Sequence, residues 1–140
     1  SPRGITHTHH IRSCYCTLFA SSFRMSPESI ILLTGALVFN GAMMGFMPWM
    51  YLGCRYILHE TYDPKRIIEE IESSQVTHII LVPSQIVELL NHQDFDPSRL
   101  TSLEMITSLG APTVFMNSMA LPKDSLPVSI KTTHCKNLDL

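Results

Sequence analysis

Side chains of metal-binding type gather near the start of the sequence. They comprise three histidines and two cysteines: His7, His9, His10, Cys14 and Cys16. Imidazole nitrogens and thiolates are common zinc ligands, but structural zinc sites pair them on turns, and two cysteines two positions apart on a helix point about 200° apart. We therefore predict no metal site here and expect Cys14 to pack in the core. A small metal-binding module using His7, His9, Cys14 and Cys16 remains an alternative.

The stretch over residues 29–54 has the composition of a membrane span or of an apolar binding surface. It carries no charged side chain and exceeds the about 20 apolar residues that cross a bilayer. Asn40, Pro48 and four glycines interrupt it, which favours a buried strand, a turn and a helix. Its methionines, with Phe46 and Trp49, suit an apolar pocket but are more often plain core. A membrane-embedded protein using this stretch is a second alternative.

Apolar spacing and turn residues predict an alternation of helices and strands. Helices are expected over 9–24, 42–52 and 83–92, and strands over 29–38, 55–59, 76–82 and 103–109. A further helix begins at Asp63-Pro64, because Asp is a good N-cap and Pro is tolerated at the first helical position. This order predicts an α/β fold, with a layered, mostly parallel sheet and flanking helices.

Bulk composition limits the functional classes. The 140 residues are 45% hydrophobic and 16% charged with a net charge of −2, so we expect a folded chain without a polybasic surface for nucleic acid. The four cysteines show no disulfide-framework spacing, and no signal peptide opens the sequence. We therefore predict a cytoplasmic location.

Several short motifs follow one another in order over the first 112 residues. They are Pro2-Arg3-Gly4-Ile5-Thr6-His7-Thr8-His9, Val38-Phe39-Asn40-Gly41, Gly53-Cys54-Arg55, Asp63-Pro64, Val76-Thr77 before Val82-Pro83, and Gly110-Ala111-Pro112. Each is weak alone. The ordered set resembles the N-terminal domain of the adenylate-forming (AMP-binding) enzymes, the superfamily of acyl-CoA synthetases, luciferases and peptide-synthetase adenylation domains.

The resemblance implies three groups of site residues. They are an ATP phosphate-binding group (Arg3, Gly4, Thr8, His9), an acyl-pocket group (Phe39, Asn40, Gly41) and an adenine and acyl loop (Gly110, Ala111, Pro112). Backbone donors with one cation suit the phosphates, since they stabilise charge moving onto pyrophosphate. Two positions depart from the family pattern: Arg3 replaces the usual Lys, and Asn40 replaces a His or an aromatic residue.

The resemblance also implies a two-step reaction. A carboxylic acid and ATP give an acyl-adenylate and pyrophosphate, and a thiol, usually that of coenzyme A, then takes the acyl group. Mg²⁺ and cationic side chains must offset the repulsion between the anionic nucleophile and leaving group. The implied partners are therefore a small carboxylic acid, such as a fatty acid, with ATP, Mg²⁺ and coenzyme A.

The family motifs do not continue to the end of the sequence. After the Gly-Ala-Pro loop the family carries a Tyr-Gly-x-Thr-Glu motif, but no Tyr follows Tyr62. We therefore expect residues 1–112 to be a partial adenylation domain and residues 113–140 to be a non-matching tail that is misframed or disordered. Since Ser1 falls within the phosphate loop of the family, we expect an internal fragment without a complete catalytic set, inactive alone.

Overall fold

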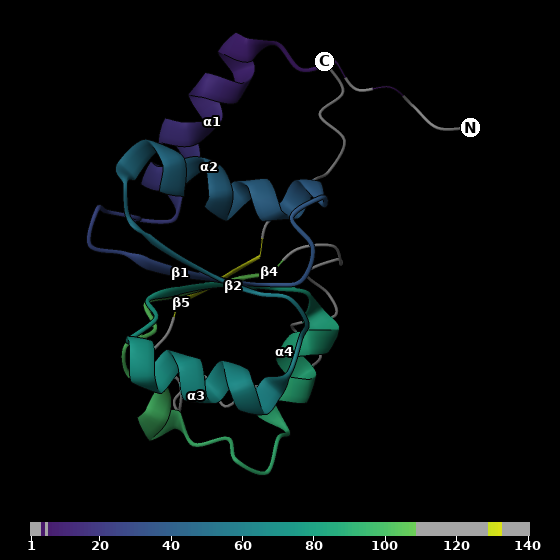
Figure 1. Ribbon diagram of the computed structural model, residues 1–140, viewed down its shortest axis with the longest axis vertical. Helices are drawn as coiled ribbons and strands as arrows, with labels where there is room; N and C mark the ends of the chain where they lie inside the picture. The colour runs from purple at the N-terminus through teal and green to yellow at the C-terminus, as the bar shows by residue number, and fades with distance from the viewer. Residues whose placement is uncertain (1–3, 5, 109–128, 133–140) are drawn as a thin grey trace.

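The chain builds one parallel sheet between two layers of helices. The computed structural model describes residues 4, 6–108 and 129–132. Its strands lie in the order β2-β1-β3-β4-β5, and every neighbouring pair is parallel. Figure 1 shows α1 and α2 on one face of the sheet and α3 and α4 on the other. The predicted α/β architecture with a parallel sheet is confirmed.

The elements follow the predicted alternation closely. The strands are β1 (Ile30–Thr34), β2 (Arg55–His59), β3 (His78–Leu81), β4 (Met105–Ser108) and β5 (Ser129–Thr132). The α-helices are α1 (His9–Ser22), α2 (Met43–Leu52), α3 (Pro64–Ser74) and α4 (Pro83–Leu90), and two short 3₁₀ helices are η1 (Asn40–Ala42) and η2 (Pro97–Leu100). The helix predicted over 42–52 forms despite Pro48.

Strand β1 is buried on both faces, as its continuous apolar run predicts. Leu32 packs into the cluster beneath α3 and α4, whereas Ile31 and Leu33 pack into the cluster beneath α1 and α2. Because side chains alternate across a strand, one short segment joins both halves of the core.

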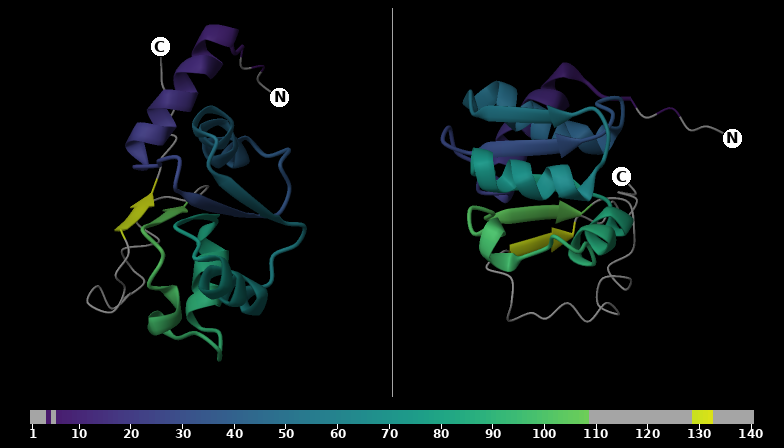
Figure 2. Two further views of the ribbon diagram at one scale, coloured as in Figure 1. Left: turned by 60° about the vertical axis from the view of Figure 1, so that its left-hand side comes forward. Right: turned by 60° about the horizontal axis from the view of Figure 1, so that its bottom comes forward.

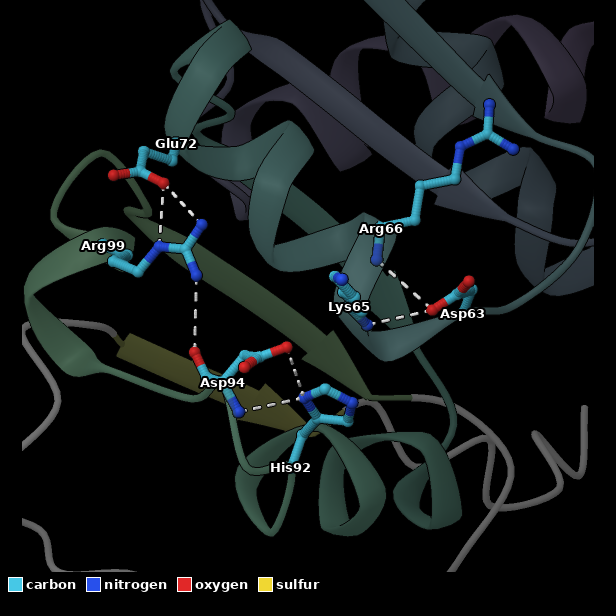
Figure 3. A network of polar contacts seen from close by, with 7 residues as sticks. All are labelled: Asp63, Lys65, Arg66, Glu72, His92, Asp94 and Arg99. Carbon is cyan, nitrogen blue, oxygen red and sulfur yellow. Dashed lines mark hydrogen bonds and ion pairs between the residues drawn. The ribbon is translucent and has the colours of Figure 1, made fainter.

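Helix α3 begins where its sequence predicts. The Oδ1 atom of Asp63 accepts hydrogen bonds from the backbone N–H groups of Lys65 (3.0 Å) and Arg66 (3.3 Å), as Figure 3 shows. This cap satisfies two of the otherwise unpaired donors of the first turn. The apolar stripe of the helix is fully buried against the sheet and consists of Ile67, Ile68 and Ile71.

The segment that follows α4 is fastened to α3 by charge. The Nη2 atom of Arg99 in η2 lies 2.6 Å from Oε2 of Glu72, and its Nε donates to the same oxygen. Figure 3 shows that His92 and Asp94 complete this polar network on the surface. These contacts attach the segment between α4 and β4 to helix α3.

Strand β1 is shorter than the apolar run predicted. The strand ends at Thr34, because Gly35 takes a left-handed φ of +103° and donates its N–H to the carbonyl of His59. Val38, expected inside the strand, is 86% exposed. The strand predicted over 76–82 is likewise trimmed at both ends, the strand predicted over 103–109 begins only at Met105, and α4 stops before His92.

The last strand lies in a segment for which the sequence shows no period. Strand β5 pairs in parallel with β4, with Met105 opposite Ser129 and Ser108 opposite Thr132. Four residues are too short a window for a period, so pairing with β4, rather than sequence pattern, determines this strand. The predicted boundary between residues 112 and 113 lies outside the described residues.

Candidate functional site

All the strands point the same way, so their carboxyl ends form one edge of the sheet. The chain leaves β1 toward α2 on one face and leaves β3 toward α4 on the opposite face (Figure 1). Since β1 and β3 are neighbours, the direction of the connections reverses between them. Open parallel sheets bind ligands outside the carboxyl ends of the strands at such a switch point. The candidate site therefore lies at this edge.

The acyl-pocket residues predicted from the sequence lie on the loop that follows β1. Phe39 and Asn40 are exposed, Gly41 is half-buried, and Phe39 is the residue that precedes η1. Phe39 is 70% exposed, and its neighbour Val38 is exposed as well. Two large apolar side chains, those of Val38 and Phe39, are thus exposed at the switch point instead of packing in the core. This arrangement offers an apolar surface beside one amide side chain.

The predicted phosphate-binding residues lie at the start of α1. The Oγ1 atom of Thr8 caps the helix by accepting the N–H of Ile11 at 3.2 Å, and His9 is exposed in the first turn. A hydroxyl that accepts a hydrogen bond can still donate its own proton. Gly4 is exposed, and a Cβ built on it would meet no atom within 4 Å. Arg3 lies outside the described residues.

The start of α1 and the carboxyl edge face the same side of the molecule. The right-hand view of Figure 2 shows the first turn of α1 on the side to which the strand arrows point. The third predicted group, Gly110, Ala111 and Pro112, lies outside the described residues, and in sequence it follows the end of β4 at Ser108. Two of the three predicted groups are thus represented on one side of the fold.

Polar side chains at the ends of β1 and β2 escaped the sequence analysis. Thr34 and His59 lie opposite each other in the ladder and are buried, and neither Thr34 Oγ1 nor His59 Nδ1 has a hydrogen-bond partner. The Nε2 atom of His59 lies 3.2 Å from Oε2 of Glu70, whose other oxygen accepts the hydroxyl of Ser74 at 2.6 Å. The Ser74 hydrogen bond, together with His59, lowers the pKa of Glu70.

Tyr62 fastens the loop after β2 to the neighbouring helix. Its hydroxyl donates to the carbonyl of Gln85 at 2.7 Å, and Gln85 Oε1 accepts the N–H of Val82 at the end of β3. Burial, with the nearby charges of Glu88 and Asp63, raises the pKa of Tyr62 to about 12. The phenol is therefore a neutral donor at physiological pH. A polar residue just after an apolar strand is the sequence signal that would have found these contacts.

The N-terminal cysteine is not where the sequence prediction placed it. Cys14 is exposed rather than packed in the core, because α1 turns the aromatic row of Tyr15, Phe19 and Phe23 inward. Among the described residues no group of three or more His, Cys, Asp or Glu side chains could hold a metal ion. The described histidines and cysteines of this segment thus form no such group.

The uncharged stretch over residues 29–54 and its methionines form regular elements of the fold. Residues 29–54 contain β1, η1 and α2, and no helix in the described part of the chain is long and apolar enough to cross a membrane. Met44 and Met47 are buried, and Phe46 and Trp49 pack against Tyr56 with ring centroids 6.1 and 5.4 Å away. Met44 therefore belongs to the core on the face covered by α1 and α2, whereas β1 contributes to the core on both faces of the sheet.

A family model and individual relatives of known name match this sequence and indicate the same family. The family model described as AMP-binding enzyme matches residues 1–114. A feruloyl-CoA synthase from Amycolatopsis is 25% identical over 115 residues, covering 79% of this chain and 23% of that protein. The medium/long-chain-fatty-acid–CoA ligase FadD8 of Mycobacterium tuberculosis is 27% identical over 105 residues, covering 75% of this chain and 18% of that protein. The chain spans less than a quarter of either relative.

Solved structures share the fold. The N-terminal domain of FACL13 from Mycobacterium tuberculosis superposes with a TM-score of 0.77 at 16% identity, covering 96% of this chain and 33% of that chain. The o-succinylbenzoate coenzyme A synthetase of Bacillus subtilis, in complex with AMP, gives 0.72 at 19% identity, covering 94% of this chain and 27% of that chain. At these identities the likeness establishes the architecture alone.

Proposed function

Since this chain belongs to the AMP-binding enzyme family, we propose that it is part of an AMP-forming acid–thiol ligase and contributes one wall of its adenylation site. In the proposed reaction a carboxylate oxygen attacks the α-phosphorus of ATP, and pyrophosphate leaves. The thiol of coenzyme A then attacks the acyl carbon, and AMP leaves. The observation that carries the proposal is the exposed loop with Phe39 and Asn40 at the switch point of a parallel sheet.

The start of α1 fits the phosphates of ATP. Backbone N–H groups at a helix start, a hydroxyl donor on Thr8 and an open backbone at Gly4 favour an anion. α1 has no acidic residue in its first turn, so no carboxylate on the helix start repels the phosphates. Arg3, the only cation of the motif, would add a fork of donors to phosphate oxygens.

The loop after β1 fits the acid. Phe39 and Val38 offer exposed apolar surface to an acyl or aryl chain, and Asn40 can donate and accept hydrogen bonds. The named relatives act on a feruloyl group or on fatty acids, and both kinds of acid join a carboxylate to an apolar body. We propose that Phe39, Asn40 and Gly41 contact the acid, and that Gly110, Ala111 and Pro112 contact adenine and the acyl group.

Mg²⁺ is implied by the family. Magnesium in nucleotide sites is usually held by one or two carboxylates together with substrate phosphates and water, and the first turn of α1 carries no carboxylate. We therefore assign Mg²⁺ no ligand in this chain. We further propose that the chain is catalytically incomplete, because no Tyr-Gly-x-Thr-Glu motif follows residue 112.

Carboxylate-dependent exchange of pyrophosphate into ATP tests the proposal of incompleteness. We expect the purified 140-residue chain to give no exchange with ferulate or fatty acids, while a feruloyl-CoA synthase assayed in parallel does. Exchange by this chain above the protein-free background would show that the missing motif is not required.

A further inference from the structure

The outer face of α1 brings together two side chains that the proposed function does not use. The Sγ atom of Cys14 lies 3.7 Å from the Nε2 atom of His10, one helical turn away. Both residues are exposed. Residues four apart lie on the same face of a helix, so the pairing follows directly from the spacing. Cys16, two positions from Cys14, points to a different face of the helix.

The separation of these two atoms matches the bite of a tetrahedral zinc ion. Zinc–nitrogen bonds of about 2.0–2.1 Å and zinc–sulfur bonds of about 2.3 Å at a tetrahedral angle place the two ligand atoms about 3.6 Å apart. The observed distance of 3.7 Å between Cys14 Sγ and His10 Nε2 is close to this separation. Exposure leaves room for the water molecules that would fill the other positions.

The surroundings favour a borderline-soft ion over magnesium or calcium. Helix α1 contains no Asp or Glu, so its ligands are an imidazole and a thiol. His7 does not join the pair, because its ring packs edge-on against Tyr15 at 5.9 Å. Cys16 does not join it either, since its Sγ lies 3.7 Å from the carbonyl of Arg12. On α1 the pair of His10 and Cys14 therefore brings one nitrogen and one sulfur together on an exposed face.

We propose that His10 and Cys14 bind a zinc ion on the outer face of α1, with water completing its coordination. Binding converts the Cys14 thiol to a zinc-bound thiolate and releases its proton to solvent. A site with two protein ligands is open and exchangeable, unlike the closed four-ligand sites that hold a fold together. The proposal is independent of the ligase function, since the pair does not include any of the residues assigned to ATP or the acid.

Competition for Zn²⁺ against a chromophoric chelator tests the pair in the full chain. We expect His10→Ala and Cys14→Ser each to weaken Zn²⁺ binding at least about tenfold, because each removes one of two ligands. The controls are Cys16→Ser on the same helix and His92→Ala outside it, which change the same residue types and should bind Zn²⁺ as the unmodified chain does. Circular dichroism of each variant checks that α1 is intact.

Proton release provides a second readout that a folding defect would not mimic. In weakly buffered solution near pH 7, Zn²⁺ should release a proton from the unmodified chain and from Cys16→Ser, but not from Cys14→Ser. The proposal is overturned if His10→Ala or Cys14→Ser binds Zn²⁺ as tightly as the controls. It is equally overturned if Cys16→Ser loses binding to the same extent as Cys14→Ser.

Discussion

Thr8 serves two purposes at the scale of single residues. Its Oγ1 caps α1 by accepting the N–H of Ile11, and its hydroxyl proton stays available for a phosphate oxygen. The two roles separate by substitution, because Asp caps a helix as well as Thr does but cannot donate at neutral pH and adds a negative charge. Ser preserves both roles.

The first prediction concerns this residue. We expect Thr8→Asp to keep the helical content of the chain and to weaken ATP binding at least about tenfold, since a hydrogen bond to a charged group contributes about 1.5–3 kcal/mol. Thr8→Ser should bind ATP as the unmodified chain does. Circular dichroism and an ATP titration check both, and equal affinities of the two variants would remove Thr8 from the phosphate site.

His78 shows how burial fixes the charge of a side chain. It is 2% exposed at the start of β3, its Nε2 donates to the carbonyl of Phe23 at 2.9 Å, and its Nδ1 lies 2.8 Å from Thr77 Oγ1. Burial lowers the pKa of His78 below its usual value, although the Phe23 hydrogen bond and Glu104 oppose the shift. The neutral ring thereby joins the sheet to the end of α1.

The second prediction follows from the sign of that shift. Because the folded chain disfavours the charged ring, the unfolded chain binds more protons as the pH falls through about 6.5, and folding stability decreases there. We expect the difference in unfolding free energy between the unmodified chain and His78→Gln to shrink from about pH 7.5 to about pH 5.5. Urea unfolding at the two pH values measures it. A constant difference would mean that His78 keeps an ordinary pKa in the fold.

Single site residues were only partly predictable from the sequence. Thr8 and Asn40 were singled out because each belongs to a local motif, and each lies at a helix start. Their contact with a ligand stays a prediction. The exposure of Cys14 was missed, because which face of α1 is covered depends on α2, a contact between distant segments. His59 was missed for the same reason, since its partner Glu70 comes from the facing helix.

At the scale of elements, α2 lies against the sheet through a glycine. A Cβ added to Gly45 would lie 2.8 Å from Cδ1 of Ile80 and 3.2 Å from Cγ2 of Ile31. Contacts this short force a shift in a packed core, which costs about 1–3 kcal/mol. Alanine is the better helix former by about 1 kcal/mol, which offsets only part of that cost. The close approach of α2 to β3 therefore depends on this glycine.

The third prediction isolates that contact. We expect Gly45→Ala to lower the unfolding free energy by about 1 kcal/mol. Ile80→Val removes the clashing Cδ1 atom and alone should cost about 0.5–1.5 kcal/mol. Since the two sites touch, the double variant should be more stable than the sum of the single changes predicts. Denaturant unfolding of all four proteins measures the coupling, and strict additivity would place α2 farther from β3.

The elements themselves were largely predictable. The start of α3 is encoded locally by Asp63 and Pro64, and the continuous apolar runs of β1 and β3 reflect burial on both faces. The ends of the strands were less predictable from the sequence. Residues 37–39 continue the apolar run of β1, yet the strand has already ended at Thr34 and the chain turns at Gly35. Val38 and Phe39 are exposed, so an apolar run does not by itself distinguish a buried strand from an exposed loop.

In the molecule as a whole, the proposed ligand-binding loops lie at one edge of the sheet. Parallel pairing brings the ends of β1, β2, β3 and β4 together, and the reversal between β1 and β3 opens the loop with Phe39 and Asn40. The same pairing puts the segments before the strands, at Ser29, Cys54 and Thr77, on the opposite edge. We propose that ATP and the acid bind at the first edge.

The most direct test of that claim is a map of backbone amide shifts in the ¹⁵N-labelled chain titrated with ATP. We predict the largest shifts at Gly4, Thr8 and His9 and in the loop over 35–41, because these amides lie on the proposed ligand side. The amides of Ser29, Cys54 and Thr77 should stay unchanged. Shifts confined to that opposite edge, or none anywhere at the highest ATP concentration, would contradict ATP binding at the carboxyl edge.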